Sequence, residues 1–280
     1  MLSDLVSFFK ERTSDFVIGR IHGTQGLGVY NISAEFAHLP STEIGAPINR
    51  ALLPGFSKMS EIDEIRMSYA NAVGLLAFLA LPAAASIFVI APFLVPVILG
   101  QKWLESVPLM QTLAFNGALL MFHASISTVL FARGFPGRVT GTNLAYVAIL
   151  AGLLAILSPH FGLLGTAYAV LLTSFLSTPI YVYQMHRCLA IRPSVFLKAV
   201  ARPSVASLLM SVLVTQVLPT YSTSMPISLV ITWLCLGILL CAISYLALAV
   251  SLWFAVGRPG GAERAILQRL RGRARSPAQP

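Results

Sequence analysis

Long apolar runs separated by short polar stretches dominate the sequence. Runs of about twenty apolar residues are long enough to cross a hydrocarbon core of about 30 Å as a helix. The pattern therefore predicts eight membrane-spanning helices joined mostly by short loops. Their expected bounds are 2–21, 27–53, 69–99, 108–132, 139–157, 161–183, 199–218 and 227–256.

Two features interrupt this regular pattern. Pro82, Pro92 and Pro96 fall inside the third expected helix, so we expect them to kink that helix or to end it early. The stretch 184–198 is polar and basic, and it is expected to be a connector at the membrane interface. The expected fold class is all-α, a polytopic membrane protein of about eight transmembrane helices.

The composition agrees with a membrane protein. Hydrophobic residues make up 56% of the chain and charged residues 10%, whereas a soluble domain has about 25% charged residues. The N-terminus lacks the basic region, short apolar core and small-residue cleavage site of a signal peptide. The three cysteines show no metal-ligand spacing and are expected to be packing residues. No metal and no cofactor are expected.

Lysine and arginine are distributed unevenly between the two sets of expected loops. Only Arg20 and Lys102 belong to one set, and Lys10, Arg12 and Arg50 fall within expected helices. The other set and the C-terminal tail hold the remaining basic residues, which are Lys58, Arg66, Arg133, Arg138, Arg187, Arg192, Lys198, Arg202, Arg258, Arg264, Arg269, Arg271, Arg273 and Arg275. Because basic loops stay in the cytoplasm, both termini are expected to be cytoplasmic, and no nucleic-acid partner is implied.

The tail 257–280 allows two interpretations. Ala265, Ile266, Leu267 and Leu270 could form a short apolar face that rests on anionic lipid among the arginines. A disordered basic tail explains the same composition. Either way, we expect a basic cytoplasmic tail rather than a packed domain.

The first two expected helices carry charged and polar residues inside apolar segments. Wound at about 100° per residue, each of these helices gathers its polar residues on one face. Because carboxylates at membrane depth are costly, we expect these faces to line a substrate- or ion-binding cavity. The candidate cavity residues are Glu11, Arg12, Asp15, Asn31, Glu35, His38, Glu43, Asn49 and Arg50.

Short motifs in the same region resemble a known transporter family. Asp15-Phe16-Val17-Ile18-Gly19-Arg20, Leu27-Gly28-Val29-Tyr30, Leu39-Pro40, Pro47-Ile48-Asn49-Arg50, Leu53-Pro54-Gly55-Phe56-Ser57 and Gly100-Gln101-Lys102-Trp103 follow one another in that order. As a set they resemble the C-terminal half of Wzx-type oligosaccharide flippases. These belong to the polysaccharide-biosynthesis branch of the multidrug/oligosaccharidyl-lipid/polysaccharide exporter superfamily.

The resemblance implies a particular architecture and function. Such transporters have two six-helix lobes around a central cavity, and they move undecaprenyl-pyrophosphate-linked sugar units across the bacterial inner membrane to make lipopolysaccharide, exopolysaccharide or capsule. On this pattern, 1–183 is the second lobe, 184–198 the connector, 199–256 two extra helices and 257–280 the tail. The first lobe is missing, so the chain is expected to be truncated or split. A partner or a second copy could supply the other half.

The chemistry of such a cargo assigns roles to the candidates. Arg12, Arg20 and Arg50 could hold phosphates, and carboxylates could bind sugar hydroxyls or a coupling ion. Glu35 is the strongest single candidate because it lies deepest in its helix. Alternatives remain open: Arg12 and Asp15 could form a simple i, i+3 ion pair, and Arg20 could extend to the interface. His38 could titrate near neutrality or make a structural hydrogen bond.

Rival functions are compatible with parts of the pattern. A drug/cation antiporter of the same superfamily would share the helices, and a non-transporting membrane fragment would explain the missing lobe. A membrane glycosyltransferase or ligase needs catalytic residues in a sizeable aqueous loop, which the short connections lack. We therefore expect a flippase or exporter and no enzyme, with lipid-linked oligosaccharide and membrane lipids as partners.

Overall fold

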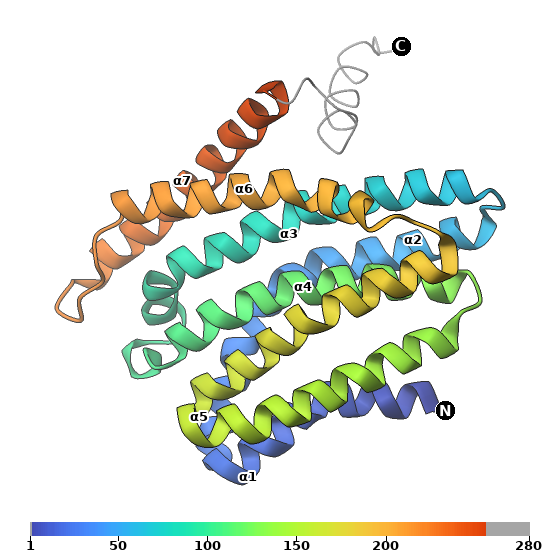
Figure 1. Cartoon of the computed structure of the whole chain (residues 1–280). Helices are drawn as coiled ribbons and strands as arrows, with labels where there is room; N and C mark the ends of the chain where they lie inside the picture. The colour runs from blue at the N-terminus through green and yellow to red at the C-terminus, as the bar shows by residue number, and fades with distance from the viewer. Residues whose placement is uncertain (1, 256–280) are drawn as a thin grey trace, which may run out of the picture.

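The computed structural model describes residues 2–255, and every regular element within that range is a helix (Figure 1). The elements in order are α1 (Leu2–Leu39), a π-helix (Pro40–Gly45), α2 (Ala46–Lys58), α3 (Ile62–Ile98), a 3-10 turn (Gln101–Trp103), α4 (Ser106–Ala132), α5 (Pro136–Leu189), α6 (Pro193–Val217) and α7 (Ile227–Ala255). Within the described part, 5 helices, α3 to α7, are long and apolar enough to cross a membrane. The predicted fold class, an all-α polytopic membrane protein, is confirmed.

Two of the long helices contain a break at a glycine. Gly23 in α1 has φ 70° and Gly162 in α5 has φ 63°, backbone angles that only glycine adopts without strain. The chain reverses direction at both breaks (Figure 1), so α1 and α5 are each a hairpin of two helices. The first break falls in the gap expected between 2–21 and 27–53, and the second falls just after the loop expected at 158–160.

The two reversals are joined by side-chain hydrogen bonds. His22 Nε2 lies 3.2 Å from Ser158 Oγ, and Thr166 Oγ1 donates to the same oxygen at 3.0 Å. Close packing at this end depends on small residues, because a Cβ on Gly26 would come within 2.7 Å of the His22 Cβ. The turns of α1 and α5 therefore form one unit at this end of the bundle.

Two buried hydrophobic clusters meet at α3. The larger cluster joins α1, α2, α4 and α5 to α3 along most of its length, from Ile65 to Val95. The smaller cluster joins α6 and α7 to the later part of α3 around Val89 and Phe93. The division into a six-helix lobe and two extra helices remains a prediction, and the expected tail 257–280 lies outside the described residues.

Two local expectations from the sequence can be compared with the helix bounds. α3 continues through Pro82, Pro92 and Pro96 and ends only at Ile98, so of the two effects expected of these prolines the early end does not occur. Proline is tolerated in membrane helices because neighbouring helices and local adjustments satisfy the freed backbone groups. The stretch 184–198 is helical except for residues 190–192, because α5 extends to Leu189 and α6 begins at Pro193. Its role as a connector at the membrane interface stays a prediction.

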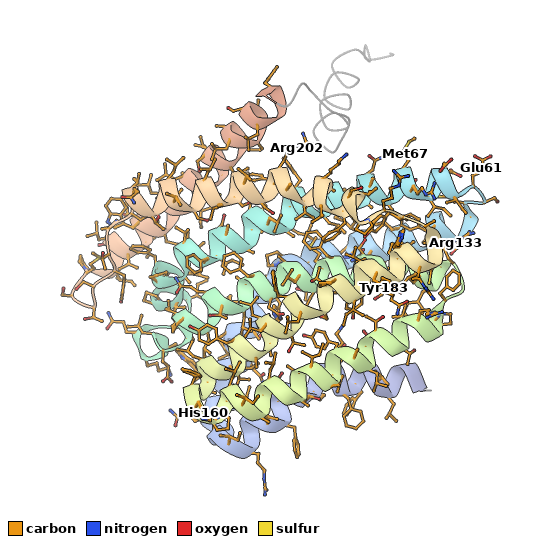
Figure 2. All side chains as sticks on the ribbon, in the orientation of Figure 1. Glu61, Met67, Arg133, His160, Tyr183 and Arg202 are labelled. Atoms are coloured by element: carbon orange, nitrogen blue, oxygen red, sulfur yellow. The ribbon has the colours of Figure 1, made fainter. Side chains whose placement is uncertain are left out.

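The basic loops lie together at one end of the bundle. Arg133 Nη1 donates to the Met59 carbonyl at 2.7 Å, and Arg66 Nη2 donates to the Ala190 carbonyl at 3.1 Å. These contacts join the connections that follow α2, α4 and α5. Figure 2 shows Glu61 and Arg133 at this end and His160 at the opposite end. The assignment of this end to the cytoplasm stays a prediction.

Candidate functional site

A cavity of about 440 Å³ lies between α1, α4 and α5. Four of the sequence-predicted residues line it: Glu11, Asp15, Asn31 and His38. They come from both halves of the α1 hairpin, so the break at Gly23 brings together two polar faces that are separate along the chain. The expected convergence of these two faces is therefore observed for this subset of residues.

Arg12 and Asp15 form an ion pair at the edge of this cavity. Arg12 Nη1 lies 3.0 Å from Asp15 Oδ2, and the arginine is exposed while the aspartate is half-buried. The i, i+3 pair that the sequence left open is thus present. Since Asp15 also lines the cavity, the pair places one carboxylate at the wall with its charge already partly compensated.

Asn49 and Arg50 line a second cavity, of about 390 Å³, between the π-helix, α2 and α4. The two cavities share Leu120 and Ala124 of α4 as lining residues, so they are neighbours along that helix. Asn49 is only 7% exposed, and neither its Nδ2 nor its Oδ1 has a hydrogen-bond partner among the described residues. An unpaired buried polar group costs about 1–3 kcal/mol.

The remaining candidates lie outside both cavities. Arg12, Glu35 and Glu43 are exposed, and none of them is a lining residue. Glu35, the strongest single candidate from the sequence, faces outward from α1 rather than into the space between α1, α4 and α5. Its carboxylate is not sealed between packed helices, and neither is that of Glu43 or Asp15.

Lys10, Asn143, Tyr146 and Tyr181 form a cluster beside the first cavity, called the Lys10 cluster below. The sequence analysis did not identify it. Lys10 Nζ donates to Tyr181 Oη at 3.1 Å and to Asn143 Oδ1 at 3.4 Å, and it lies 4.7 Å from the centre of the Tyr146 ring. Among the side chains that the structure describes, no carboxylate forms an ion pair with Lys10. Neutral oxygens and a ring face thus hold the end of the Lys10 side chain at the wall of the cavity.

A chain of hydrogen bonds extends from this cluster through the bundle. The Tyr146 hydroxyl lies 3.1 Å from Ser174 Oγ, which donates to Asn116 Oδ1 at 2.5 Å. Asn116 Nδ2 lies 3.1 Å from His38 Nε2, so the chain returns to α1. His38 therefore has the structural hydrogen bond that was one of its two alternatives.

His123, to which the sequence assigned no role, also belongs to this region. Its ring stacks on Tyr181 with centroids 4.2 Å apart, and its Nε2 lies 2.9 Å from Thr178 Oγ1. The stacked ring fixes the Tyr181 hydroxyl toward Lys10. One signal for the cluster was present in the sequence: a lysine inside an expected membrane helix, together with Asn143 and Tyr146 three residues apart on one helix face.

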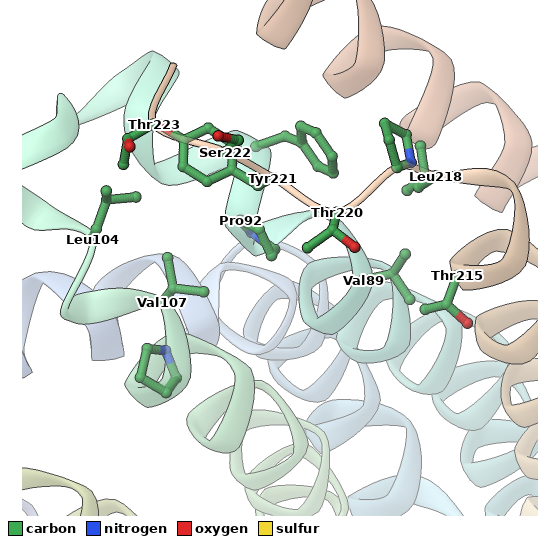
Figure 3. Close-up of a pocket in the computed structure, with 13 residues that line it drawn as sticks. Val89, Pro92, Leu104, Val107, Thr215, Leu218, Thr220, Tyr221, Ser222 and Thr223 are labelled. Atoms are coloured by element: carbon green, nitrogen blue, oxygen red, sulfur yellow. The ribbon is translucent and has the colours of Figure 1, made fainter. Parts of the chain in front are cut away.

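A third cavity, of about 730 Å³, lies between α3, the start of α4 and the connection from α6 to α7 (Figure 3). Its lining residues are apolar or carry hydroxyl groups, and none of them is charged. The Tyr221 ring meets the Phe93 ring edge-on at 6.1 Å, and Gln101 Nε2 donates to the Thr223 carbonyl at 3.4 Å. This space has none of the ionic chemistry of the other two.

Comparison with known proteins identifies relatives of the chain. Residues 1–108 match a family model described as a polysaccharide biosynthesis protein. The matched part contains every residue that the sequence proposed for the cavity. The predicted resemblance to polysaccharide-biosynthesis proteins is thereby confirmed.

Two curated relatives carry names from the same area. The chain is 26% identical to the lipopolysaccharide biosynthesis protein WzxC of Escherichia coli over 187 residues, which is 65% of this chain and 37% of that protein. It is 29% identical to the teichuronic acid biosynthesis protein TuaB of Bacillus subtilis over 133 residues, which is 47% of this chain and 28% of that protein. The chain thus spans about a third of the length of the curated relatives it matches.

A solved structure shares the fold. The lipid II flippase MurJ in an inward closed conformation superposes with a TM-score of 0.73 over 91% of this chain and 52% of that protein, at 12% sequence identity. At this identity the likeness concerns the arrangement of helices. The present chain has the fold of about half of that structure.

Proposed function

We propose that this chain forms half of a transporter that moves a lipid-linked oligosaccharide across the bacterial inner membrane during the synthesis of a surface polysaccharide. The observation that carries the proposal is the polar cavity between α1, α4 and α5, which has Lys10, Glu11 and Asp15 in its wall. Charged groups at membrane depth mark pathways for polar substrates or ions. The matched family and the shared fold support the same conclusion.

The two cavities offer complementary chemistry for such a cargo. The Lys10 ammonium and the Arg50 guanidinium are cations that can bind phosphate oxygens, as a point charge and as a planar fork. Asn31 and Asn49 supply amides for sugar hydroxyls. An undecaprenyl pyrophosphate with attached sugars fits this combination of groups, and an ion gradient would drive its movement.

The outward-facing carboxylates support a second half of the transporter. Glu35 and Glu43 are exposed on α1 and the π-helix, where contact with lipid alone would be costly. We infer that this face lines a central space opposite another lobe. That lobe could come from a longer chain, from a partner protein or from a second copy, and it would allow alternating access between the lobes.

The test uses the gene at its own chromosomal locus. Arg50→Ala and Glu35→Gln remove charge from the second cavity and from the outward face, and we expect each to abolish surface polysaccharide without lowering the amount of protein in the membrane. Lys58→Ala, at the exposed last residue of α2, is the matched control and should keep the wild-type level. Normal polysaccharide in both test variants would remove these residues from the site. Resistance to cationic dyes with no effect on polysaccharide would favour the antiporter.

A further inference from the structure

We propose that the second cavity is a subsite for a hydroxyl-rich sugar of the cargo, bound by the side-chain amide of Asn49. This inference rests on the proposed function, because it assigns the sugar part of that substrate to a defined place. The cavity is formed by the π-helix, α2 and α4. It adjoins the first cavity, with which it shares the lining residues Leu120 and Ala124.

The unpaired amide of Asn49 points to a ligand. Both polar atoms of this side chain are buried without a partner among the described residues, although buried amides in proteins nearly always form hydrogen bonds. Leucine has almost the same volume and would fill the position without that cost. An amide here is explained if a bound molecule supplies the missing donor and acceptor.

The backbone around Asn49 brings α2 against α4. The chain enters α2 through a π-helix, a form found frequently at functional sites. Gly45 allows the close approach, because a Cβ there would come within 2.6 Å of the Met121 side chain. The geometry therefore holds Asn49 and Arg50 next to Thr128 and Met121 in one small space.

The polar groups in this space define what the ligand must offer. Ser41 Oγ donates to the His38 carbonyl at 2.8 Å, and Thr128 Oγ1 donates to the Ala124 carbonyl at 2.9 Å. Each hydroxyl has used its hydrogen, so each can only accept from a ligand. The cavity therefore presents three hydrogen-bond acceptors to a ligand, which are Ser41 Oγ, Thr128 Oγ1 and Asn49 Oδ1.

A sugar meets this requirement better than other molecules. Its hydroxyl groups donate to the acceptors and accept from Asn49 Nδ2, while Leu53, Leu120 and Met121 offer an apolar wall to the C–H face of the ring. A fully ionised phosphate has no hydrogens to donate, and Arg50 at the margin suits such a neighbouring anion. Because both amide atoms are covered in this structure, binding requires a shift of lining side chains such as Met121.

The experiment measures binding of two lipids to the full chain in lipid nanodiscs. One probe is undecaprenyl pyrophosphate carrying the oligosaccharide extracted from the host strain, and the other is undecaprenyl pyrophosphate alone. We expect Asn49→Leu to weaken binding of the sugar-bearing lipid about tenfold and to leave binding of the bare lipid within about twofold. Asn71→Leu, at an exposed position of α3, should change neither.

The melting temperature separates a binding role from a structural one. Asn49→Leu removes an unpaired buried amide, so we expect this variant to melt at or above the wild-type temperature. Thr128→Val is a second, nearly isosteric variant, and it should weaken only the sugar-bearing lipid. Two results would overturn the subsite. In one, the wild type and both variants bind each lipid with the same affinity; in the other, the substitutions weaken binding of the sugar-bearing lipid and of the bare lipid equally. Failure of the wild type to bind either lipid would overturn the proposed function itself, and the subsite with it.

Discussion

The ammonium of Lys10 donates a hydrogen bond to the hydroxyl oxygen of Tyr181 at 3.1 Å, joining α1 to the second half of α5. Tyr181 in turn donates to Asn143 Oδ1 at 2.7 Å, in the first half of α5. The tyrosine oxygen therefore accepts from the cation and donates to the amide. This arrangement fixes the position of the Lys10 nitrogen at the wall of the first cavity, and none of the described carboxylates is its ion-pair partner.

Replacing Lys10 by methionine is expected to lower transport strongly while leaving the fold intact. The methionine chain keeps most of the packing volume, and Tyr181 and Asn143 remain hydrogen-bonded to each other. A charged hydrogen-bond partner for a bound anion is worth about 1.5–3 kcal/mol, so we expect surface polysaccharide to fall about tenfold or more. The measurements are polysaccharide at the cell surface and protein abundance in the membrane fraction.

The control for this variant is Lys58→Met, which removes a lysine at the exposed last residue of α2. It should retain the wild-type level of polysaccharide. If Lys10→Met also retains that level, the ammonium serves only to hold α1 against α5, and the cation assigned to the cavity must be another.

Asn116 is expected to be the most sensitive member of the hydrogen-bond chain for stability. It is fully buried and contacts His38 of α1 and Ser174 of α5. Asn116→Leu would leave both of these groups without that partner, and we expect the free energy of unfolding to fall by about 1–3 kcal/mol. Thermal unfolding in detergent, compared with exposed Asn71→Leu, measures the effect. If the Asn116→Leu protein has the same melting temperature as the wild type, the hydrogen bonds of Asn116 do not contribute to stability as expected.

The sequence predicted the helices better than the site. Apolar length sets where a chain crosses lipid, so the polar breaks near Gly23 and Gly162 could be located from composition and turn residues. A helical wheel places Glu35 and Asn31 on a polar face, but it does not say which neighbouring helix that face meets. In the structure Asn31 lines the first cavity, while Glu35 is exposed and lines neither cavity.

The Lys10 cluster shows why the rest could not be predicted from one sequence. Lys10, Asn143 and Tyr181 are far apart along the chain and come together only when the two hairpins pack. The positions of amides and tyrosines in one sequence do not by themselves distinguish a lipid-facing position from a buried one. The polar atoms of Asn49 could be recognised as unpaired only after the positions of their neighbours were known.

The orientation in the membrane can be tested with single cysteines. Cys188, Cys235 and Cys241 are first replaced by alanine, and Ser222→Cys or Lys58→Cys is then introduced at exposed positions of the α6–α7 connection and the end of α2. Since basic loops remain in the cytoplasm, a membrane-impermeant maleimide should label residue 222 in intact cells. It should label residue 58 only after permeabilisation. The reverse pattern would contradict the predicted cytoplasmic position of both termini.

Gly165 is expected to be essential for the α5 hairpin. A Cβ at this position would lie 2.0 Å from the Leu157 carbonyl oxygen and 2.9 Å from the Phe161 Cβ. These atoms belong to the same hairpin, on the other side of the break at Gly162, so relief requires the two halves of α5 to separate. Gly165→Ala should therefore lower the free energy of unfolding by about 1–3 kcal/mol or more, measured by thermal unfolding in detergent. Gly152→Ala in the same helix meets nothing within 4 Å and should instead raise stability by about 0.5–1 kcal/mol; equal melting of the two variants would exclude the close approach at Gly165.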